Sequence, residues 1–286
     1  MMKFGCTVAL QYDTPFSPFG AGEFEEALLW LRESGFDGAE LCISDYENCD
    51  VIELKERLDS YGLACPTIST GQALGRENIS LLHTGTALDR AQERLCRHID
   101  AAKVLGSKVT IGLLRGDGRA GRGGMDGMEG GAGERRKLLA EHMAPVIHYA
   151  KKQGVILLLE PINRYETGLL NGAVETLKFI ENELGGEDCV EILWDVFHAN
   201  LEDASLYTIP AAIKSHFGHV HLADSNRWFP GFGHLDFPGI LRGIRDAGYA
   251  GYYSFECLNR PSVEVVRTQA KGFVQYMRGL LEAGEG

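Results

Sequence analysis

Short apolar runs alternate with longer amphipathic stretches along the whole chain. Eight of the runs have the length and β-branched or aromatic content of strands, and the stretches between them have helical periodicity. This alternation predicts βα units around a parallel sheet. The expected strands are Lys3 to Leu10, Gly38 to Ile43, Ala64 to Ser69, Lys108 to Leu114, Val155 to Glu160, Glu191 to Asp195, His219 to Asp224 and Tyr252 to Cys257. The expected helices are Glu23 to Ser34, Val51 to Tyr61, Ala87 to Leu105, Glu134 to Gln153, Ala173 to Leu184, Phe237 to Ala247 and Val263 to Glu282, with a shorter segment near Ile209 to Ser215.

Glycine recurs where an expected helix stops before the next strand. It does so at Gly35, Gly62, Gly106, Gly154 and Gly248, and glycine tolerates the left-handed backbone of a helix C-terminus. Eight units in 286 residues leave about 36 residues per unit, close to the size of a (β/α)8 repeat. We therefore predict an α/β fold, a (β/α)8 TIM barrel that forms a single domain over residues 1–286. An open doubly wound sheet is the competing architecture.

The composition of the chain argues against some kinds of binding partner. Hydrophobic residues make up 44% of the chain and charged residues 24%, which suits an ordinary globular core. The formal charge of −12 opposes a broad nucleic-acid surface, since such a surface must neutralise phosphates. No apolar run approaches the roughly 20 residues of a membrane helix and no secretory signal is evident, so we expect no membrane partner and a cytoplasmic location. The seven cysteines are scattered and odd in number, which predicts reduced thiols, mostly in the core.

A glycine-rich segment covers residues 116–133. Its Gly116-x-Gly118-x-x-Gly121 matches the dinucleotide-binding pattern, but glycines continue where the phosphate-binding helix should begin, so we reject that interpretation. A flexible surface loop is expected instead. The alternative is a lid over the barrel mouth, with Arg115, Arg119 or Arg122 reaching an anionic group of the substrate.

Potential metal ligands end four consecutive strands of the expected barrel. Glu160, Asp195 and Glu256 each follow an apolar run, and the run between the last two carries His219 and His221. In a parallel barrel these strand ends face one space, where three carboxylates would repel one another without a cation. Oxygen ligands with one imidazole suit Mn²⁺, Mg²⁺ or Co²⁺ better than a structural zinc. Strand alternation sends both histidines to the same side and cannot choose between them.

The motifs around these residues resemble a known family. The chain is similar to the xylose isomerase-like barrel superfamily and, within it, to the ketose 3-epimerases, with Asp195 and His221 26 residues apart and His221 and Glu256 35 apart. The motifs are Glu160-Pro-Ile-Asn-Arg-Tyr-Glu-Thr167, Trp194-Asp-Val-Phe-His198, Gly218 to Arg227, Pro230-Gly-x-Gly-His-x-Asp-Phe237 and Ser254-Phe-Glu256. Three further segments, Ser69 to Ala73, Ile111 to Gly116 and Ser225 to Trp228, resemble epimerases of keto-hexuronates of the 5-keto-L-gluconate type.

The resemblance implies a role for each matching residue. Glu160, Asp195, His221 and Glu256 would bind a divalent metal, with Mn²⁺ favoured over Mg²⁺ or Co²⁺, and the resemblance selects His221 over His219. Glu160 and Glu256 would also exchange the proton next to the carbonyl of a ketose or keto-hexuronate, through a cis-enediolate. Glu166, His198, Arg227, Gln72 and Arg115 would contact the sugar or sugar-acid substrate. A homo-oligomer is also implied, as many relatives are dimers or tetramers.

Other functions use the same barrel. An aldose–ketose or hydroxypyruvate isomerase would return the proton to the neighbouring carbon, and dehydration of an inosose would begin with the same proton removal. An endonuclease IV-like phosphodiesterase is opposed by the negative charge and by the shortage of histidines at other strand ends. A sugar-binding barrel without catalysis does not require a carboxylate-rich metal site. The substrate and the carbon that is inverted stay open.

Overall fold

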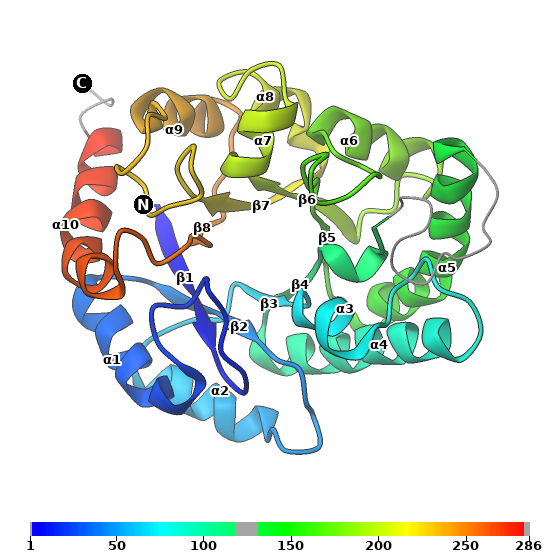
Figure 1. The fold of residues 1–286 in the computed structure, drawn as a ribbon, viewed down its shortest axis with the longest axis horizontal. Coiled ribbons are helices and arrows are strands. Elements are labelled where there is room, and N and C mark those ends of the chain that lie inside the picture. The colour runs from blue at the N-terminus through cyan, green and yellow to red at the C-terminus, as the bar shows by residue number, and fades with distance from the viewer. Residues whose placement is uncertain (1, 118–130, 283–286) are drawn as a thin grey trace.

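The computed structural model describes residues 2–117 and 131–282. In this part of the chain eight parallel strands form a closed barrel in sequence order, and the first strand pairs with the last (Figure 1). The strands are β1 (Lys3–Ala9), β2 (Gly38–Cys42), β3 (Thr67–Ser69), β4 (Lys108–Ile111), β5 (Leu157–Leu159), β6 (Val190–Asp195), β7 (Phe217–Leu222) and β8 (Tyr252–Phe255). The predicted (β/α)8 TIM barrel is confirmed, and ring closure excludes the open sheet.

Helices surround the ring of strands (Figure 1). They are α1 (Phe24–Ser34), α2 (Val51–Ser60), α3 (Gln72–Glu77), α4 (Thr86–Leu105), α5 (Ala132–Gln153), α6 (Ala173–Asn182), α7 (Val196–Glu202), α8 (Ile209–Ala212), α9 (Phe237–Asp246) and α10 (Val263–Glu282), with short 3-10 turns at Ala21–Glu23, Leu113–Arg115 and Lys214–His216. All five glycines predicted to end helices have a positive φ. The sequence pattern missed α3 and α7, because one or two helical turns are too short to display a period.

All eight strands differ by one to three residues from their predicted bounds, and two of these differences have a clear physical cause. The third begins at Thr67 rather than Ala64, because Pro66 has no N–H for the ladder and Ala64 forms only an isolated bridge to Gly38. The seventh ends at Leu222, whereas Asp224 was expected to end it. Asp224 leaves the sheet because its side chain accepts backbone hydrogen bonds within the following loop.

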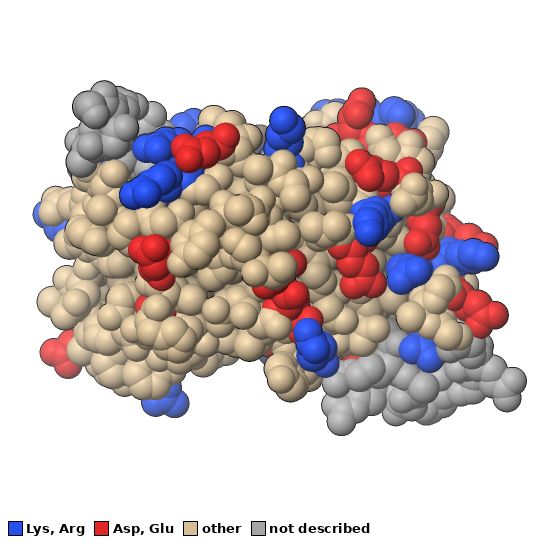
Figure 2. Space-filling model, turned by 90° about the horizontal axis from the view of Figure 1, so that it is seen from above, with Lys and Arg blue, Asp and Glu red and all other residues tan. Residues whose placement is uncertain are grey.

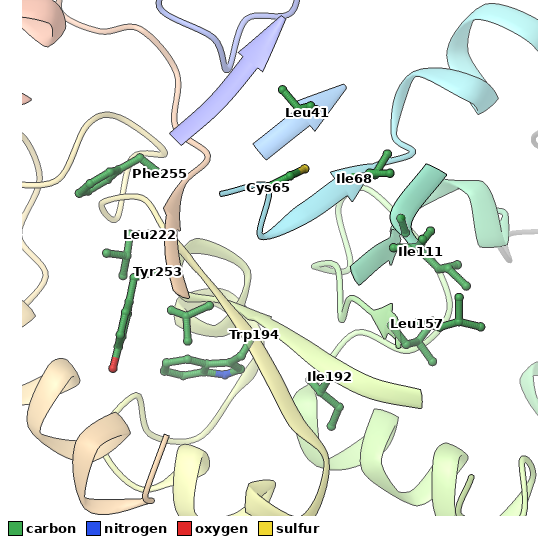
Figure 3. Close-up of a cluster of buried hydrophobic side chains, with 14 of the residues drawn as sticks. Leu41, Cys65, Ile68, Ile111, Leu157, Ile192, Trp194, Leu222, Tyr253 and Phe255 are labelled. Carbon is green, nitrogen blue, oxygen red and sulfur yellow. The ribbon is translucent and has the colours of Figure 1, made fainter. Parts of the chain in front are cut away.

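Strand alternation separates an apolar outer layer from a polar barrel interior. Ile192, Trp194 and Tyr253 lie on the side of the sheet that faces the helices (Figure 3). Their neighbours Asp195 and Ser254 therefore point into the barrel, since successive side chains of a strand point to opposite faces. Inside the barrel the Thr67 and Thr110 hydroxyls lie 2.7 Å apart, and both are buried. A layer of apolar side chains thus surrounds the polar side chains inside the barrel and separates them from water.

The structure describes all seven cysteines but only a part of the glycine-rich segment. All seven cysteines are free, and Cys49 and Cys96 alone are not fully buried. Basic and acidic side chains are interspersed on the face in Figure 2. No helix in the described residues is long and apolar enough to cross a membrane. Most of the predicted glycine-rich loop, including Arg119 and Arg122, lies outside the described residues.

Candidate active site

Four predicted metal ligands meet at the C-terminal end of the barrel. Glu160 follows β5, Asp195 ends β6, His221 lies near the end of β7 and Glu256 follows β8. Each offers one ligand atom, and these four atoms all lie within 4.8 Å of one another. His221 Nδ1 is 3.8, 3.7 and 3.6 Å from a carboxylate oxygen of Glu160, Asp195 and Glu256 respectively. The four residues predicted from the strand ends therefore lie together in one cluster.

Two atoms of this cluster are buried without a hydrogen-bond partner. They are Asp195 Oδ2 and His221 Nδ1, which lie 3.7 Å apart. Buried polar atoms are normally satisfied, so a pair that faces the same space requires an explanation. A cation between them would satisfy both. Three carboxylates and one imidazole also form the hard, oxygen-rich donor set that suits a divalent ion, so the residues present fit such an ion.

The electrostatics of the cluster also favour a positive charge. Burial and the nearby Glu256 and Asp195 raise the pKa of Glu160 well above its usual range. Burial and, to a lesser degree, Glu256 raise the pKa of Asp195 to about 6. Burial acts to lower the pKa of His221, but Glu40 and Glu256 outweigh it and raise that pKa well above its usual value. The site thus attracts a proton or a metal ion to offset its crowded carboxylates.

The two histidines of β7 have different neighbours. His221 Nε2 lies 3.0 Å from Glu40 Oε2, which leaves Nδ1 facing the carboxylate cluster. His219 lies one layer deeper, with its Nε2 3.0 Å from the Ser254 hydroxyl. His221 is therefore the histidine of the cluster. Sequence reasoning missed Glu40, because it lies inside an apolar run and not at a strand end; a single carboxylate between Ala39 and Leu41 was the available signal.

A cavity of about 250 Å³ opens beside the cluster. Glu160, Glu256, His198, Arg227 and Gln72 all line it, so these predicted residues share one space. The other lining residues are Asp13, Thr14, Pro15, Phe16, Cys42, Ser69, Gly71, Thr110, Gly112, Leu113 and Ile162. A Cβ at Gly112 would lie 2.6 Å from Glu160 Oε2, so only glycine leaves that carboxylate its room.

Arg227 reaches the cavity from the loop after β7. Its guanidinium donates to Glu166 Oε1 at 3.0 Å, and its NH2 group is 3.7 Å from Glu256 Oε2. The same group lies over the ring of Phe16, 4.6 Å from the ring centre. Its Nε–H is buried and has no hydrogen-bond partner. Arg227 thus lines the cavity next to two carboxylates, those of Glu166 and Glu256.

His198 is held as a neutral imidazole with a defined orientation. The Asn163 side-chain oxygen accepts from the Tyr165 N–H, which turns its amide N–H₂ toward His198 Nδ1, 2.7 Å away. Nδ1 is therefore the acceptor, and the proton lies on Nε2, 4.0 Å from Glu160 Oε1. Burial and the Arg227 charge keep the pKa of His198 well below its usual value. Asn163 belongs to the motif that begins at Glu160, but no role was expected for it.

The last two predicted contacts are placed differently from each other. The amide oxygen of Gln72 accepts from the Ser44 hydroxyl at 2.6 Å, and the side chain lines the cavity. Arg115 is completely buried instead, and its guanidinium donates to the backbone carbonyls of Glu160, Leu169 and Leu170. This placement corrects the expected substrate contact: the 3-10 turn at Leu113–Arg115 directs the side chain beneath Glu160 and away from the cavity.

Known proteins resemble this chain in sequence and in structure. The family model of the xylose isomerase-like TIM barrel matches residues 28–278. An L-ribulose 3-epimerase from Mesorhizobium japonicum is 33% identical over 242 residues, which cover 85% of this chain and 78% of that protein. A 3-dehydro-D-guloside 4-epimerase from Escherichia coli is 33% identical over 122 residues, covering 42% and 45% of the two chains. A solved L-ribulose 3-epimerase structure superposes with a TM-score of 0.81 at 25% identity, over 100% of this chain and 97% of that one. The chain therefore belongs to the xylose isomerase-like TIM barrel family, and relatives within it are sugar epimerases.

Proposed function

We propose that this protein is a divalent-metal-dependent sugar epimerase that inverts a carbon next to the carbonyl group of a ketose. The observation that carries the proposal is the meeting of Glu160, Asp195, His221 and Glu256 in one cluster with two unpartnered polar atoms, beside a cavity of about 250 Å³ that Glu160 and Glu256 line. The named activities of the relatives support the same reaction class.

The four clustered residues would hold the metal, with Mn²⁺ proposed first and Mg²⁺ or Co²⁺ as substitutes. The ion would supply Lewis-acid polarisation of the substrate's carbonyl oxygen, which acidifies the proton on the adjacent carbon. The chain's own residues would carry out the remaining tasks.

Glu160 and Glu256 would exchange that proton. They follow β5 and β8, so two strands separate their origins, and both line the cavity. One carboxylate would remove the proton to form a cis-enediolate of the sugar, and the other would deliver a proton to the opposite face of the same carbon. The raised pKa of Glu160 suits proton transfer near neutral pH, because catalysis is most efficient when the pKa of the base is near the working pH.

Arg227 and His198 would bind substrate oxygens. Both side chains line the cavity, and His198, whose Nδ1 faces Asn163, would donate from Nε2. Gln72, fixed by Ser44, and Glu166, fixed by Arg227, would contact hydroxyls farther from the reacting carbon.

A neutral ketose is proposed ahead of a keto-hexuronate. In the described part of the cavity wall Arg227 is the single cationic side chain, and it is already paired with Glu166 and close to Glu256. A sugar carboxylate would compete with both glutamates for it. The motif resemblance to keto-hexuronate epimerases makes that class the second candidate in the test.

The test is proton NMR of the Mn²⁺-activated protein in D₂O, after removal of excess metal, with ketopentoses, ketohexoses, a keto-hexuronate and hydroxypyruvate. We expect deuterium uptake next to the carbonyl of a neutral ketose, together with its epimer. An aldose product would replace the epimerase with an isomerase. If no substrate takes up deuterium while metal is bound, the proposed reaction class is wrong.

A further inference from the structure

Glu40 forms a buried pair with His221, which is one of the four proposed metal ligands. Glu40 lies in β2, between the helix-facing residues Ala39 and Leu41, so its side chain points into the barrel. Its Oε2 is 3.0 Å from His221 Nε2, and 181 residues separate the two in sequence. Both side chains are essentially inaccessible to water. Neither the sequence motifs nor the proposed mechanism assigns Glu40 a role.

A carboxylate in this position carries an energetic cost. Removal of a carboxylate from water costs several kcal/mol even after relaxation of the surroundings, and a buried ion pair often adds no net stability. Glu40 Oε1 has no hydrogen-bond partner, which makes the position still less favourable. An apolar side chain would fill the same space without this cost. A contribution of Glu40 to folding therefore does not explain its presence.

The geometry at His221 suggests another role. An imidazole that donates from one nitrogen presents the lone pair of the other, and a carboxylate that accepts the first hydrogen bond fixes both the tautomer and the ring orientation. Here the nitrogen held by Glu40 is Nε2, and the nitrogen left over is the unpartnered Nδ1 that faces Glu160, Asp195 and Glu256.

His219 and Ser254 complete the support. His219 Nε2 lies 3.5 Å from the same Glu40 oxygen and 3.0 Å from the Ser254 hydroxyl. Ser254 has room because its neighbour on β1 is Gly5, where a Cβ would lie 2.9 Å from the hydroxyl oxygen. His219 thus approaches the Glu40 carboxylate from a second side.

We propose that Glu40 is a positioning residue that orients His221 Nδ1 toward a divalent metal ion and strengthens metal binding, although it touches neither metal nor substrate. The inference rests on the proposed metal site. It also assigns His219 to the support of Glu40 rather than to the metal.

The test measures Mn²⁺ affinity by titration calorimetry on the whole protein, without any sugar. Glu40→Met keeps the volume and removes the acceptor, and we expect its Mn²⁺ dissociation constant to rise by about tenfold to a hundredfold. Glu40→Gln retains an accepting oxygen without the charge, and we expect a smaller loss. Thr67→Val is the matched control, because it removes a buried hydrogen bond inside the same barrel without touching His221.

The outcomes separate the alternatives. Weaker Mn²⁺ binding in the Glu40 variants but not in Thr67→Val supports the proposal, whatever the unfolding temperatures are. Unchanged affinity in a folded Glu40→Gln or Glu40→Met protein overturns it and leaves the epimerase intact. Affinity that depends on Glu40 in a protein that turns over no sugar keeps this inference and refutes the proposed function. If the wild-type protein binds no divalent metal, both are wrong.

Discussion

Glu160 and Glu256 occupy different surroundings although both are carboxylates at strand ends. Arg115 donates to the backbone carbonyl of Glu160 from below, whereas Arg227 lies 3.7 Å from the carboxylate of Glu256. Each glutamate thus has its own arginine, one acting on the backbone and one on the side chain. The two carboxylates therefore differ in their surroundings, and burial together with the nearby Glu256 raises the pKa of Glu160.

Replacement of either glutamate by glutamine should remove the group that exchanges the proton and leave the shape of the side chain unchanged. We expect Glu160→Gln and Glu256→Gln each to lower turnover by at least about a hundredfold. Deuterium uptake followed by NMR measures the loss, with circular dichroism as the control for folding. Turnover close to that of the wild type in one variant would remove that residue from the mechanism.

His98 gives a prediction at acid pH that is independent of the active site. It lies in α4, is 1% exposed, and has Nδ1 next to the Tyr46 hydroxyl. Burial, with a smaller contribution from Arg94, lowers its pKa from 6.5 to about 3. The unfolded chain therefore takes up a proton between pH 6.5 and 3 that the folded protein does not. The contribution of His98 to stability is complete above pH 6.5 and decreases as the pH falls toward 3.

Between pH 6.5 and 5 this loss amounts to about 2 kcal/mol. Urea unfolding of the wild type and of His98→Gln at both pH values measures it. We expect the variant to lose less of its unfolding free energy over this interval. Equal losses in the two proteins would show that another group accounts for the acid sensitivity.

At the level of single elements, the loop after β7 depends on one buried carboxylate. Asp224 accepts hydrogen bonds from the backbone N–H groups of Ser225, Gly231 and Leu235, at 2.8 to 3.1 Å. The folded loop carries Arg227 in a left-handed conformation, with φ of 62°, which is unusual for a residue with a side chain. Asp224 thus stabilises the backbone that presents Arg227 to the cavity.

Asp224→Asn leaves one accepting oxygen for three N–H groups. We expect a cost of about 1–3 kcal/mol in loop order, seen as a decrease in kcat/KM of about tenfold to a hundredfold. In an Arg227→Lys background the same substitution should add little, because the two residues act through one structure. Additive losses in this double-mutant cycle would contradict the link between Asp224 and Arg227.

Some of these elements and residues could be predicted from the sequence, and others could not. The alternation of eight strand-like runs with helical segments predicted the barrel, and five helix-ending glycines supported it, since both patterns are local and repeated along the chain. The strand-end carboxylates predicted the cluster, because barrel geometry alone brings consecutive strand ends together. Glu40 and the burial of Arg115 were not predictable in this way: one depends on a contact across 181 residues, and the other on the direction of a single 3-10 turn.

For the molecule as a whole, the two ends of the barrel have separate tasks. The carboxylate cluster lies at the C-terminal end, whereas Gly218, the second residue of β7, lies near the opposite end. A Cβ there would meet the Glu191 side chain at 2.4 Å and Leu158 at 2.6 Å. The β6–β7 pairing shifts register nearby, between Ile192 and Leu193. Substitutions at this end of a barrel are expected to alter stability rather than chemistry.

Gly218→Ala should therefore destabilise the protein by about 1–3 kcal/mol through overpacking. Metal affinity and turnover at low temperature should remain at wild-type values. Urea unfolding and the NMR assay, performed on the same preparation, test both statements. A loss of activity without a loss of stability would show that strain passes along β7 to His221.

The pair of Glu40 and His221 also has a consequence for folding. All four proposed metal ligands come from the last four strands, but the carboxylate that holds His221 comes from the second. Contacts between residues so distant in sequence form late, since a long loop must close before they can contribute. Full metal affinity would then arise only after β1 has joined β8, and its appearance during refolding would time the closure of the ring. A newly synthesised chain would then bind the metal tightly only after its barrel has closed.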